Sequence, residues 1–224
     1  MSTKLLTPEN VLQGTKVINA SHEPHSLEDC RRLVARGYQA LSTKRLALED
    51  VYADLCQDPY QPNGHALTVA TLSPNHEGSV ISGTARLVIG ADRGDGVAPI
   101  ESMGLLDLQG VWPHKVKGIP VGKTAEIGRL VIDKLFREPT EVKVGLTRQI
   151  YDALVAMAEQ RGIEMIYAIM PQIVVDICRE ASIGMEQVPG FQLRETSENK
   201  HIFDTYDVYW GRLDPRLYVF KNSK

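Results

Sequence analysis

The sequence lacks an excess of positive charge. Its 25 Lys and Arg residues stand against 28 Asp and Glu, so the formal net charge is −3 and the sequence pI is near 6.1. A protein that neutralises a nucleic-acid backbone needs an electropositive surface to do so. We therefore expect no nucleic-acid partner.

Long apolar runs are also lacking. No run approaches the ~20 residues that a membrane-spanning helix needs, and the polar N-terminal region contains no apolar core of a secretory signal. The cysteines are odd in number and far apart, at Cys30, Cys56 and Cys178, which does not predict a disulfide framework. These absences favour a soluble, cytoplasmic protein without a membrane span.

Metal-ligating and nucleophilic motifs are scarce. His22 and His25 are two potential ligands, but no further His or Cys follows at ligand spacing, so we expect no metal site. Cys178 lies beside an apolar helical stripe and is interpreted as a buried structural thiol. No Gly-x-Ser-x-Gly elbow is present. The sequence therefore predicts chemistry without a covalent enzyme intermediate.

What is present is enough apolar material for a substantial core. The chain has 224 residues, of which 43% are hydrophobic. Residues 1–25 are polar, contain two prolines and show no sustained period, so we interpret them as an N-terminal arm. Residues 26–224 are expected to form a single domain.

The periodicity of the sequence predicts an alternation of helices and strands. We expect the following elements in chain order: a helix from Ser26 to about Leu41, a long loop over 45–64, a hairpin of Ala66–Leu72 and Ser79–Ile89, an excursion over 91–122 with one short helix, a strand at Thr124–Asp133, a helix ending near Gly162, a strand at Ile163–Met170, a helix from Pro171 to Gly184, and a strand around Phe203–Trp210. This order predicts an α/β fold of three layers with a mixed sheet.

Two charges interrupt the apolar strand at 124–133. Glu126 could act as a general base there, because partial burial raises the pKa of a carboxyl group. The alternative is a structural ion pair with Arg129, three residues further along the strand. Side chains alternate along a strand, so the two residues face opposite sides unless a bulge intervenes. Both interpretations stay open on these residues alone.

Four short segments resemble the acyl-homoserine-lactone (autoinducer) synthases and the N-acyl amino acid synthases, which belong to the GNAT-like N-acyltransferase superfamily. These segments are Ala35-Arg36-Gly37-Tyr38, Asp58-Pro59-Tyr60, Gly83-Thr84-Ala85-Arg86-Leu87, and Ala125-Glu126-Ile127-Gly128-Arg129-Leu130-Val131-Ile132-Asp133. The resemblance implies a GNAT-like three-layer fold with a splayed central sheet. It also implies an N-acyltransferase, which moves an acyl chain from a thioester to an amine.

The resemblance assigns roles to individual residues. Glu126 and Arg129 are expected at the catalytic centre, while Arg36, Asp58 and Arg86 are expected to bind substrate or order the substrate loop. Ordinary salt bridges are the alternative for the arginines, and a turn signal is the alternative for Asp58, which precedes a proline.

The sequence departs from the family pattern at two places. The loop after the first helix has no tryptophan, where the lactone synthases usually carry one, and this favours an amino acid or related amine as the acceptor. The segment from Arg137 to Arg148 contains only Gly145, whereas acetyl-CoA enzymes have several glycines there to bind pyrophosphate. Acyl carrier protein (ACP) is therefore the expected donor and partner, with acyl-CoA as the alternative and no tightly bound cofactor. Lys134, Arg137, Lys143 and Arg148 could meet an acidic carrier.

An acyl pocket is expected where the sheet splays. We predict that it is lined by Ile127, Val131, Ile166 and Ala168, from the two strands that flank the splay. The predicted function is thus an ACP-dependent N-acyltransferase. The alternatives are an acetyl-CoA-dependent GNAT acetyltransferase and a non-catalytic module that binds an acyl group.

Overall fold

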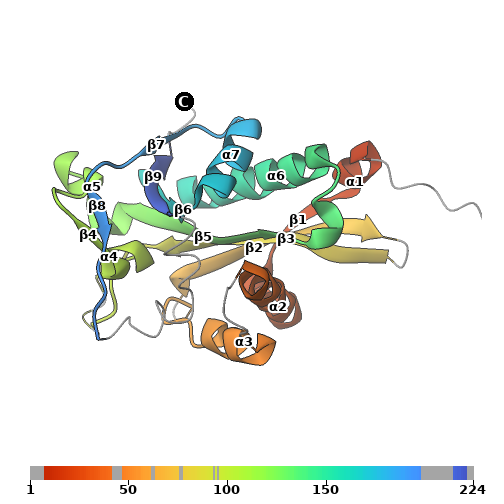
Figure 1. Ribbon diagram of the computed structural model, residues 1–224, viewed down its shortest axis with the longest axis horizontal. Coiled ribbons are helices and arrows are strands. Elements are labelled where there is room, and N and C mark those ends of the chain that lie inside the picture. The colour runs from red at the N-terminus through yellow and green to blue at the C-terminus, as the bar shows by residue number, and fades with distance from the viewer. Residues whose placement is uncertain are drawn as a thin grey trace, which may run out of the picture.

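A seven-stranded mixed sheet forms the centre of the molecule, with helices on both faces (Figure 1). The computed structural model describes residues 8–41, 47–61, 64–75, 78–92, 94, 96–197 and 214–220. The strand order is β1-β2-β3-β5-β6-β9-β7, in which β5 and β6 run parallel and the other neighbours run antiparallel. The predicted α/β architecture with a mixed sheet is confirmed.

The strands of the main sheet are β1 (Lys16–Asn19), β2 (Ala66–Asn75), β3 (Gly78–Ile89), β5 (Thr124–Ile132), β6 (Met165–Met170), β7 (Met185–Gln187) and β9 (Arg216–Phe220). A second sheet pairs β4 (Leu106–Leu108) with β8 (Phe191–Leu193). The α-helices are α1 (Pro8–Gly14), α2 (Pro24–Leu41), α3 (Leu48–Cys56), α4 (Glu101–Leu105), α5 (Pro113–Val116), α6 (Thr140–Glu159) and α7 (Gln172–Glu180). Short 3₁₀ turns are η1 (Ala20–His22), η3 (Val121–Lys123) and η4 (Lys134–Phe136).

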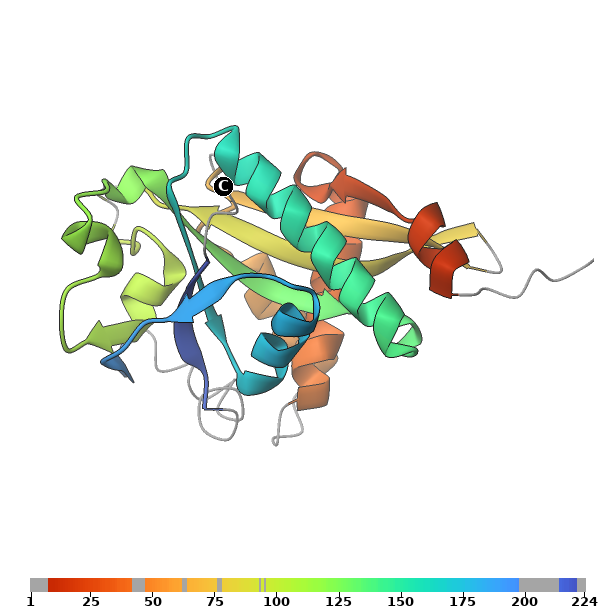
Figure 2. The same ribbon diagram turned by 90° about the horizontal axis from the view of Figure 1, so that it is seen from above.

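The helices form two separate layers. Helices α2 and α3 cover one face of the sheet, and α6 and α7 cover the other (Figure 1). Seen from above, α6 crosses the strands diagonally (Figure 2). The largest hydrophobic cluster lies under α6 and α7, and a smaller one lies under α2 and α3. The sheet is therefore buried on both faces, as a mixed α/β sheet requires.

Helix α3 corrects the predicted loop over 45–64. Val51 and Leu55 are buried against Leu33 and Val34 of α2, and Leu48 precedes them at helical spacing. The prolines and Gly64 that suggested a loop all follow the end of this helix. Residue composition averaged over the whole segment concealed its apolar face.

The predicted hairpin is confirmed and is longer than expected. Strand β2 continues through Pro74, which pairs with Ser79 of β3. Proline has no N–H to donate to a neighbouring strand. It is tolerated here because β1 pairs with β2 only as far as Leu72, so no strand lies on that side of Pro74 among the described residues.

The described part of the N-terminal region is integrated into the fold. Strand β1 extends the sheet beside β2, and α1 packs on α6. Leu12 of α1 lies against Gly145, since a Cβ at this glycine would meet the Leu12 methyl groups at 2.7 Å. The side chain of Gln149 also donates to the Leu12 carbonyl at 3.3 Å. Residues 8–22 thus gain their order from tertiary contacts rather than from an internal pattern.

The excursion between β3 and β5 contains two short α-helices, α4 and α5, rather than one. Fully buried Ile100 anchors the start of α4 in a cluster with Leu106, Tyr167 and Leu217. Together with β4 and β8, these helices lie at one end of the main sheet (Figure 1).

The β–α–β unit predicted after residue 124 is confirmed as β5, α6 and β6. The strand predicted around Phe203–Trp210 lies outside the described residues. Of the described helices, none combines the length and hydropathy needed to cross a membrane.

Candidate active site

A β-bulge in β5 lies at the charged positions. Arg129 and Leu130 together face Ala85 alone on β3, and Arg129 has a φ of 56°. This left-handed conformation is uncommon for a residue with a side chain. The extra residue reverses the alternation of β5, so the side chain of Arg129 lies on the same face as Glu126. The two charges that strand alternation would separate are therefore brought to one side of the sheet.

Arg86 is at the centre of a buried ion cluster on this face. Its guanidinium group donates to the carboxylates of Asp58 and Glu101, and its side chain is only 3% exposed. Asp58 also lies 3.0 Å from Nη1 of Arg129 and accepts a hydrogen bond from the Tyr60 amide at 3.0 Å. Asp58 thus connects both guanidinium groups.

The charges in this cluster stabilise one another. Burial alone would raise the pKa of Asp58, but Arg86 and Arg129 hold it below its ordinary value. Burial would likewise lower the pKa of Arg86, yet the carboxylates of Glu101 and Asp58 raise it. For Arg129, burial and the like charge of Arg86 outweigh the carboxylates of Asp58 and Glu101, so its pKa is lowered. Asp58 and Arg86 are therefore held ionised at neutral pH.

The site contains three carboxyl groups, those of Asp58, Glu101 and Glu126. Among the described contacts, Asp58 and Glu101 are bonded to arginine, and Glu126 is not. It is 5% exposed and accepts a hydrogen bond from the Ser102 amide at 2.8 Å. Burial, followed by the nearby charge of Glu101, raises the pKa of Glu126 to about 7. A carboxyl group with this pKa can accept a proton near neutral pH and release it again, which is the requirement for a general base.

An apolar pocket of about 510 Å³, including the space at its mouth, opens on the other face of the sheet. Strands β5 and β6 pair only over residues 124–126 and 165–167, and the pocket lies beyond that paired region. Its lining comes from both strands and from α6 and α7, and it includes Ile127, Leu130, Ile150, Leu154, Ala168 and Val174. Failure of the two strands to pair further creates the splay and this opening.

A second pocket, of about 310 Å³, lies under α2. Most of the surface that lines it is apolar, as in the first pocket, but seven of its twelve lining residues are polar or charged, among them Asp58, Arg86, Thr68 and Thr84, and we refer to it as the polar pocket. Ala85 and Arg129, which face each other at the bulge, line both pockets. The bulge is therefore where the apolar pocket and the polar pocket meet. Glu126 lines neither of them.

Arg36 and two of the residues expected in the acyl pocket lie away from the sites predicted for them. Arg36 has a side chain that is 52% exposed and pairs with Asp133 at 3.6 Å, outside the ion cluster. Val131 faces α2 and packs under Gly37, while Ile166 belongs to the core but does not line the apolar pocket. Of the four residues expected there, Ile127 and Ala168 line it.

Glu101 and Tyr60 are site residues that the sequence did not reveal. Glu101 is in an excursion rich in glycine and proline, where no periodicity marks it. The Tyr60 ring lies 5.8 Å from the Arg86 guanidinium carbon, a cation–π distance. Its position in the segment Asp58-Pro59-Tyr60 was the available signal.

Cys178, a minor candidate from the sequence, is also located. Cys178 is buried and lines the apolar pocket, where burial raises the pKa of its thiol to about 11. Within the described ranges, no group of three or more His, Cys, Asp or Glu side chains is arranged to hold a metal ion.

The architecture is that of the GNAT fold. No protein-family model and no curated protein matches the sequence, but solved structures do match the fold. An acetyltransferase from Streptococcus agalactiae has a TM-score of 0.52 at 14% identity, covering 92% of this chain and 98% of its own. A GNAT-family acetyltransferase from Staphylococcus aureus has a TM-score of 0.50 at 15% identity, covering 92% and 97%. FeeM, an N-acyl amino acid synthase from uncultured soil microbes, has a TM-score of 0.52 at 14% identity, covering 92% and 89%. These likenesses establish the fold.

Proposed function

We propose that this protein is an N-acyltransferase that joins an acyl chain from ACP to the amine of an amino acid or a related small molecule. The observation that carries the proposal is the meeting of two pockets at Arg129, on opposite faces of a GNAT-type sheet, one lined mainly by apolar residues and the other by a majority of polar and charged residues. An acyl chain fits the first by its hydrophobicity, and a polar acceptor fits the second. FeeM, which shares the fold, is described as an N-acyl amino acid synthase.

The reaction needs a neutral amine beside a thioester carbonyl. The amine nitrogen attacks the carbonyl carbon, the C–N bond forms, and the C–S bond breaks to release the thiol of the carrier arm. Glu126 accepts the proton that the amine nitrogen loses and then returns a proton to the departing thiolate, so the thiol is released and the base is regenerated. Because Glu126 lines neither pocket, the proton is transferred through a water molecule.

Arg129 is proposed to bind polar groups at the junction. Its side chain is 15% exposed and its Nη1 contacts Asp58, which fixes one edge of the guanidinium fork. The remaining edge is suited to the thioester oxygen or to a carboxylate of the acceptor. Arg86 has both of its terminal nitrogens bonded to carboxylates, so we assign it to positioning Asp58 and Glu101.

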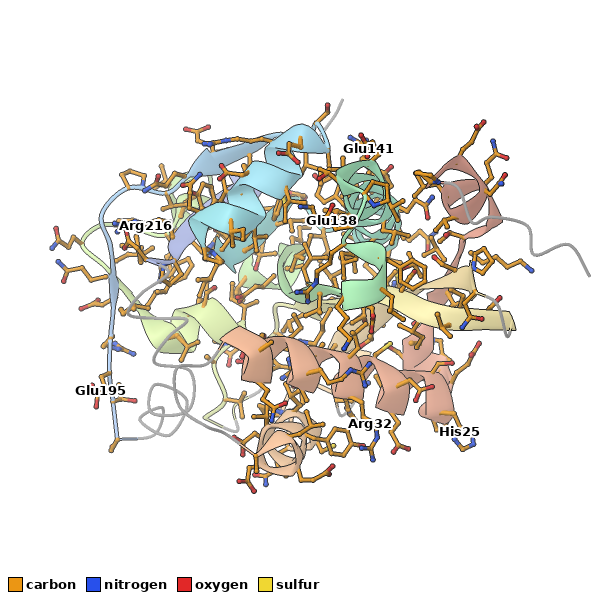
Figure 3. The ribbon with its side chains drawn as sticks, turned by 45° about the vertical axis from the view of Figure 1, so that its right-hand side comes forward. His25, Arg32, Glu138, Glu141, Glu195 and Arg216 are labelled. Carbon is orange, nitrogen blue, oxygen red and sulfur yellow. The ribbon has the colours of Figure 1, made fainter. Side chains whose placement is uncertain are left out.

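The start of α6 supports a carrier-protein donor over a nucleotide donor. In acetyl-CoA enzymes, a glycine-rich segment at a helix start exposes amide N–H groups to pyrophosphate. Here Pro139 precedes the helix and has no N–H, and the acidic Glu138 and Glu141 flank it (Figure 3). Gly145 is the one glycine of this segment, and the Leu12 side chain fills the space beside it. A pyrophosphate would meet two carboxylates at this site.

The basic residues near α6 give partial support for an acidic carrier. Lys134 and Arg137 are exposed beside Leu135, an apolar residue that is 71% exposed. Arg148, in contrast, pairs with Asp152 at 2.9 Å. We therefore assign the carrier contact to the segment around Lys134 rather than to α6 as a whole.

Mass spectrometry tests the function directly. The protein is incubated with a mixture of amino acids and either acyl-ACP or acyl-CoA, with acyl chains from acetyl to long, and N-acyl products are sought. The proposal predicts N-acyl amino acids from long-chain acyl-ACP. Products from acetyl-CoA alone would instead assign a generic acetyltransferase, and tight acyl binding without any product would assign a non-catalytic acyl-binding module.

A further inference from the structure

Two consecutive residues at the start of α4 contact Arg86 and Glu126. The Glu101 carboxylate accepts a hydrogen bond from Nη2 of Arg86, and the backbone amide of Ser102 donates to Glu126 at 2.8 Å. The side chain of Glu101 is 34% exposed, compared with 2% for Asp58. Helix α4 therefore brings to Glu126 both a fixed hydrogen bond and a carboxylate that is partly open to solvent.

The charges of the ion cluster beside Glu126 balance only when Glu101 is included. Arg86 from β3 and Arg129 from β5 face Asp58, which follows α3, and Glu101 from α4. Among the residues that the structure describes, Tyr38 from α2 is a further titratable group near Glu126. Two guanidinium groups and two carboxylates leave this cluster of described residues neutral. Without Glu101, the cluster next to Glu126 would keep one uncompensated positive charge.

We infer that Glu101 is a positioning residue for the reaction, which keeps Glu126 an effective proton acceptor by neutralising Arg86. This inference rests on the proposed function for its catalytic meaning. Its electrostatic content, however, concerns the resting protein and can be measured without turnover.

The neutralisation has a chemical consequence. A carboxylate next to an unpaired guanidinium group is stabilised as the anion, so it binds a proton weakly and is a poor base. With Arg86 already bonded to Asp58 and Glu101, its attraction for Glu126 is largely compensated, and the negative charge of Glu101 itself opposes ionisation of Glu126. Both effects of Glu101 act in the same direction.

A purely structural role for Glu101 makes a different prediction. If Glu101 only fixed α4 to the sheet, Glu101→Gln would keep a hydrogen-bond acceptor for Arg86 and would change stability alone. A charge-dependent role requires that the proton affinity of Glu126 falls in this variant while the fold is retained.

The test is an NMR titration of protein labelled with ¹³C at the glutamate carboxyl carbons, without substrate. The Glu126 signal is identified as the one missing from Glu126→Gln. Glu101→Gln should lower its titration midpoint by about 1 pH unit. Glu101→Asp keeps the charge and should restore most of the shift. Asp107→Asn, which removes the exposed carboxylate of β4 in the same excursion, should leave the midpoint unchanged.

An unchanged or raised midpoint in folded Glu101→Gln overturns the inference, as does an equal shift in Asp107→Asn. Should Glu101→Gln fail to fold, Glu101→Ala replaces it with the same expected direction, because it also leaves Arg86 half compensated. In activity assays the acid limb of kcat/KM should move to lower pH in Glu101→Gln, and the plateau should fall several-fold because the base is weaker.

The two proposals fail separately. If the midpoint shifts as expected but no donor and acceptor give an N-acyl product, the proposed function is wrong and the electrostatic role stands. If products form but the titration midpoint of Glu126 is the same in wild type and in Glu101→Gln, the function stands and this inference is wrong.

Discussion

Asp58 lies 3.0 Å from Arg129, and the same carboxylate oxygen accepts a hydrogen bond from Arg86. One buried carboxylate thus fixes two guanidinium groups that come from different strands. Because Arg129 lines both pockets, the position of Asp58 determines the geometry of the junction between them.

Removing this charge should destabilise the protein. Asp58→Asn leaves two buried guanidinium groups with a neutral partner, and we expect a loss of about 3 kcal/mol in the free energy of unfolding. Asp133→Asn is the control, because Asp133 pairs with a half-exposed arginine and should change stability by about 0.5 kcal/mol or less. Urea unfolding followed by circular dichroism measures both. Equal losses in the two variants would show that Asp58 has no special role.

The same carboxylate predicts a dependence of stability on acid. Its pKa in the folded protein is below the ordinary value of 3.8. A lowered carboxyl pKa gives stabilisation that is complete above the unfolded value and is lost as pH falls through the folded one. The difference in unfolding free energy between wild type and Asp58→Asn should therefore be constant near neutral pH and shrink below pH 3.8. A difference that persists unchanged in acid would contradict this assignment.

Much of the fold was predictable because apolar periodicity is a local signal. The run at 124–133 stood out as a strand interrupted by Glu126 and Arg129, and the hairpin was marked by its turn residues. Helix α3 was missed because turn residues crowd around it. In the site, the bulge was not predictable, since only the pairing of Ala85 against two residues of β5 creates it. Glu101 could not be predicted for the same reason, because its role depends on a contact with Arg86 of β3, which is distant in the sequence.

Chain-length selection should be set by Ala168, which lines the apolar pocket. Ala168→Phe fills part of that volume, so kcat/KM should fall most for long acyl donors and least for the shortest, since each excluded methylene removes about 0.8 kcal/mol of burial. Val131→Leu enlarges a β5 residue that faces α2 instead and should not change the preference. Steady-state assays with donors of increasing length measure this. A uniform loss for all chain lengths would indicate core damage and no acyl site.

Recognition of the donor should depend on salt and on Lys134. Catalytic efficiency with acyl-ACP should fall as ionic strength rises, because screening weakens contacts between exposed charges. Lys134→Glu should raise KM for acyl-ACP several-fold and leave KM for a free acyl-pantetheine unchanged. The matched control is Lys117→Glu, at the exposed end of α5, which should behave as wild type. An equal effect of both variants would remove the carrier contact from the segment around Lys134.

The central claim is that Glu126 accepts the proton of the acceptor amine, and single-turnover acyl transfer from a long-chain acyl-ACP to an amino acid tests it most directly. Glu126→Gln preserves the shape and the acceptor oxygen for the Ser102 amide, so the variant should fold while the rate of N-acyl product formation falls on the order of 100-fold. The wild-type rate should rise with pH through a midpoint near 7, and the variant should lose that limb. A folded Glu126→Gln protein that forms product at the wild-type rate, with the same pH dependence, would contradict the account.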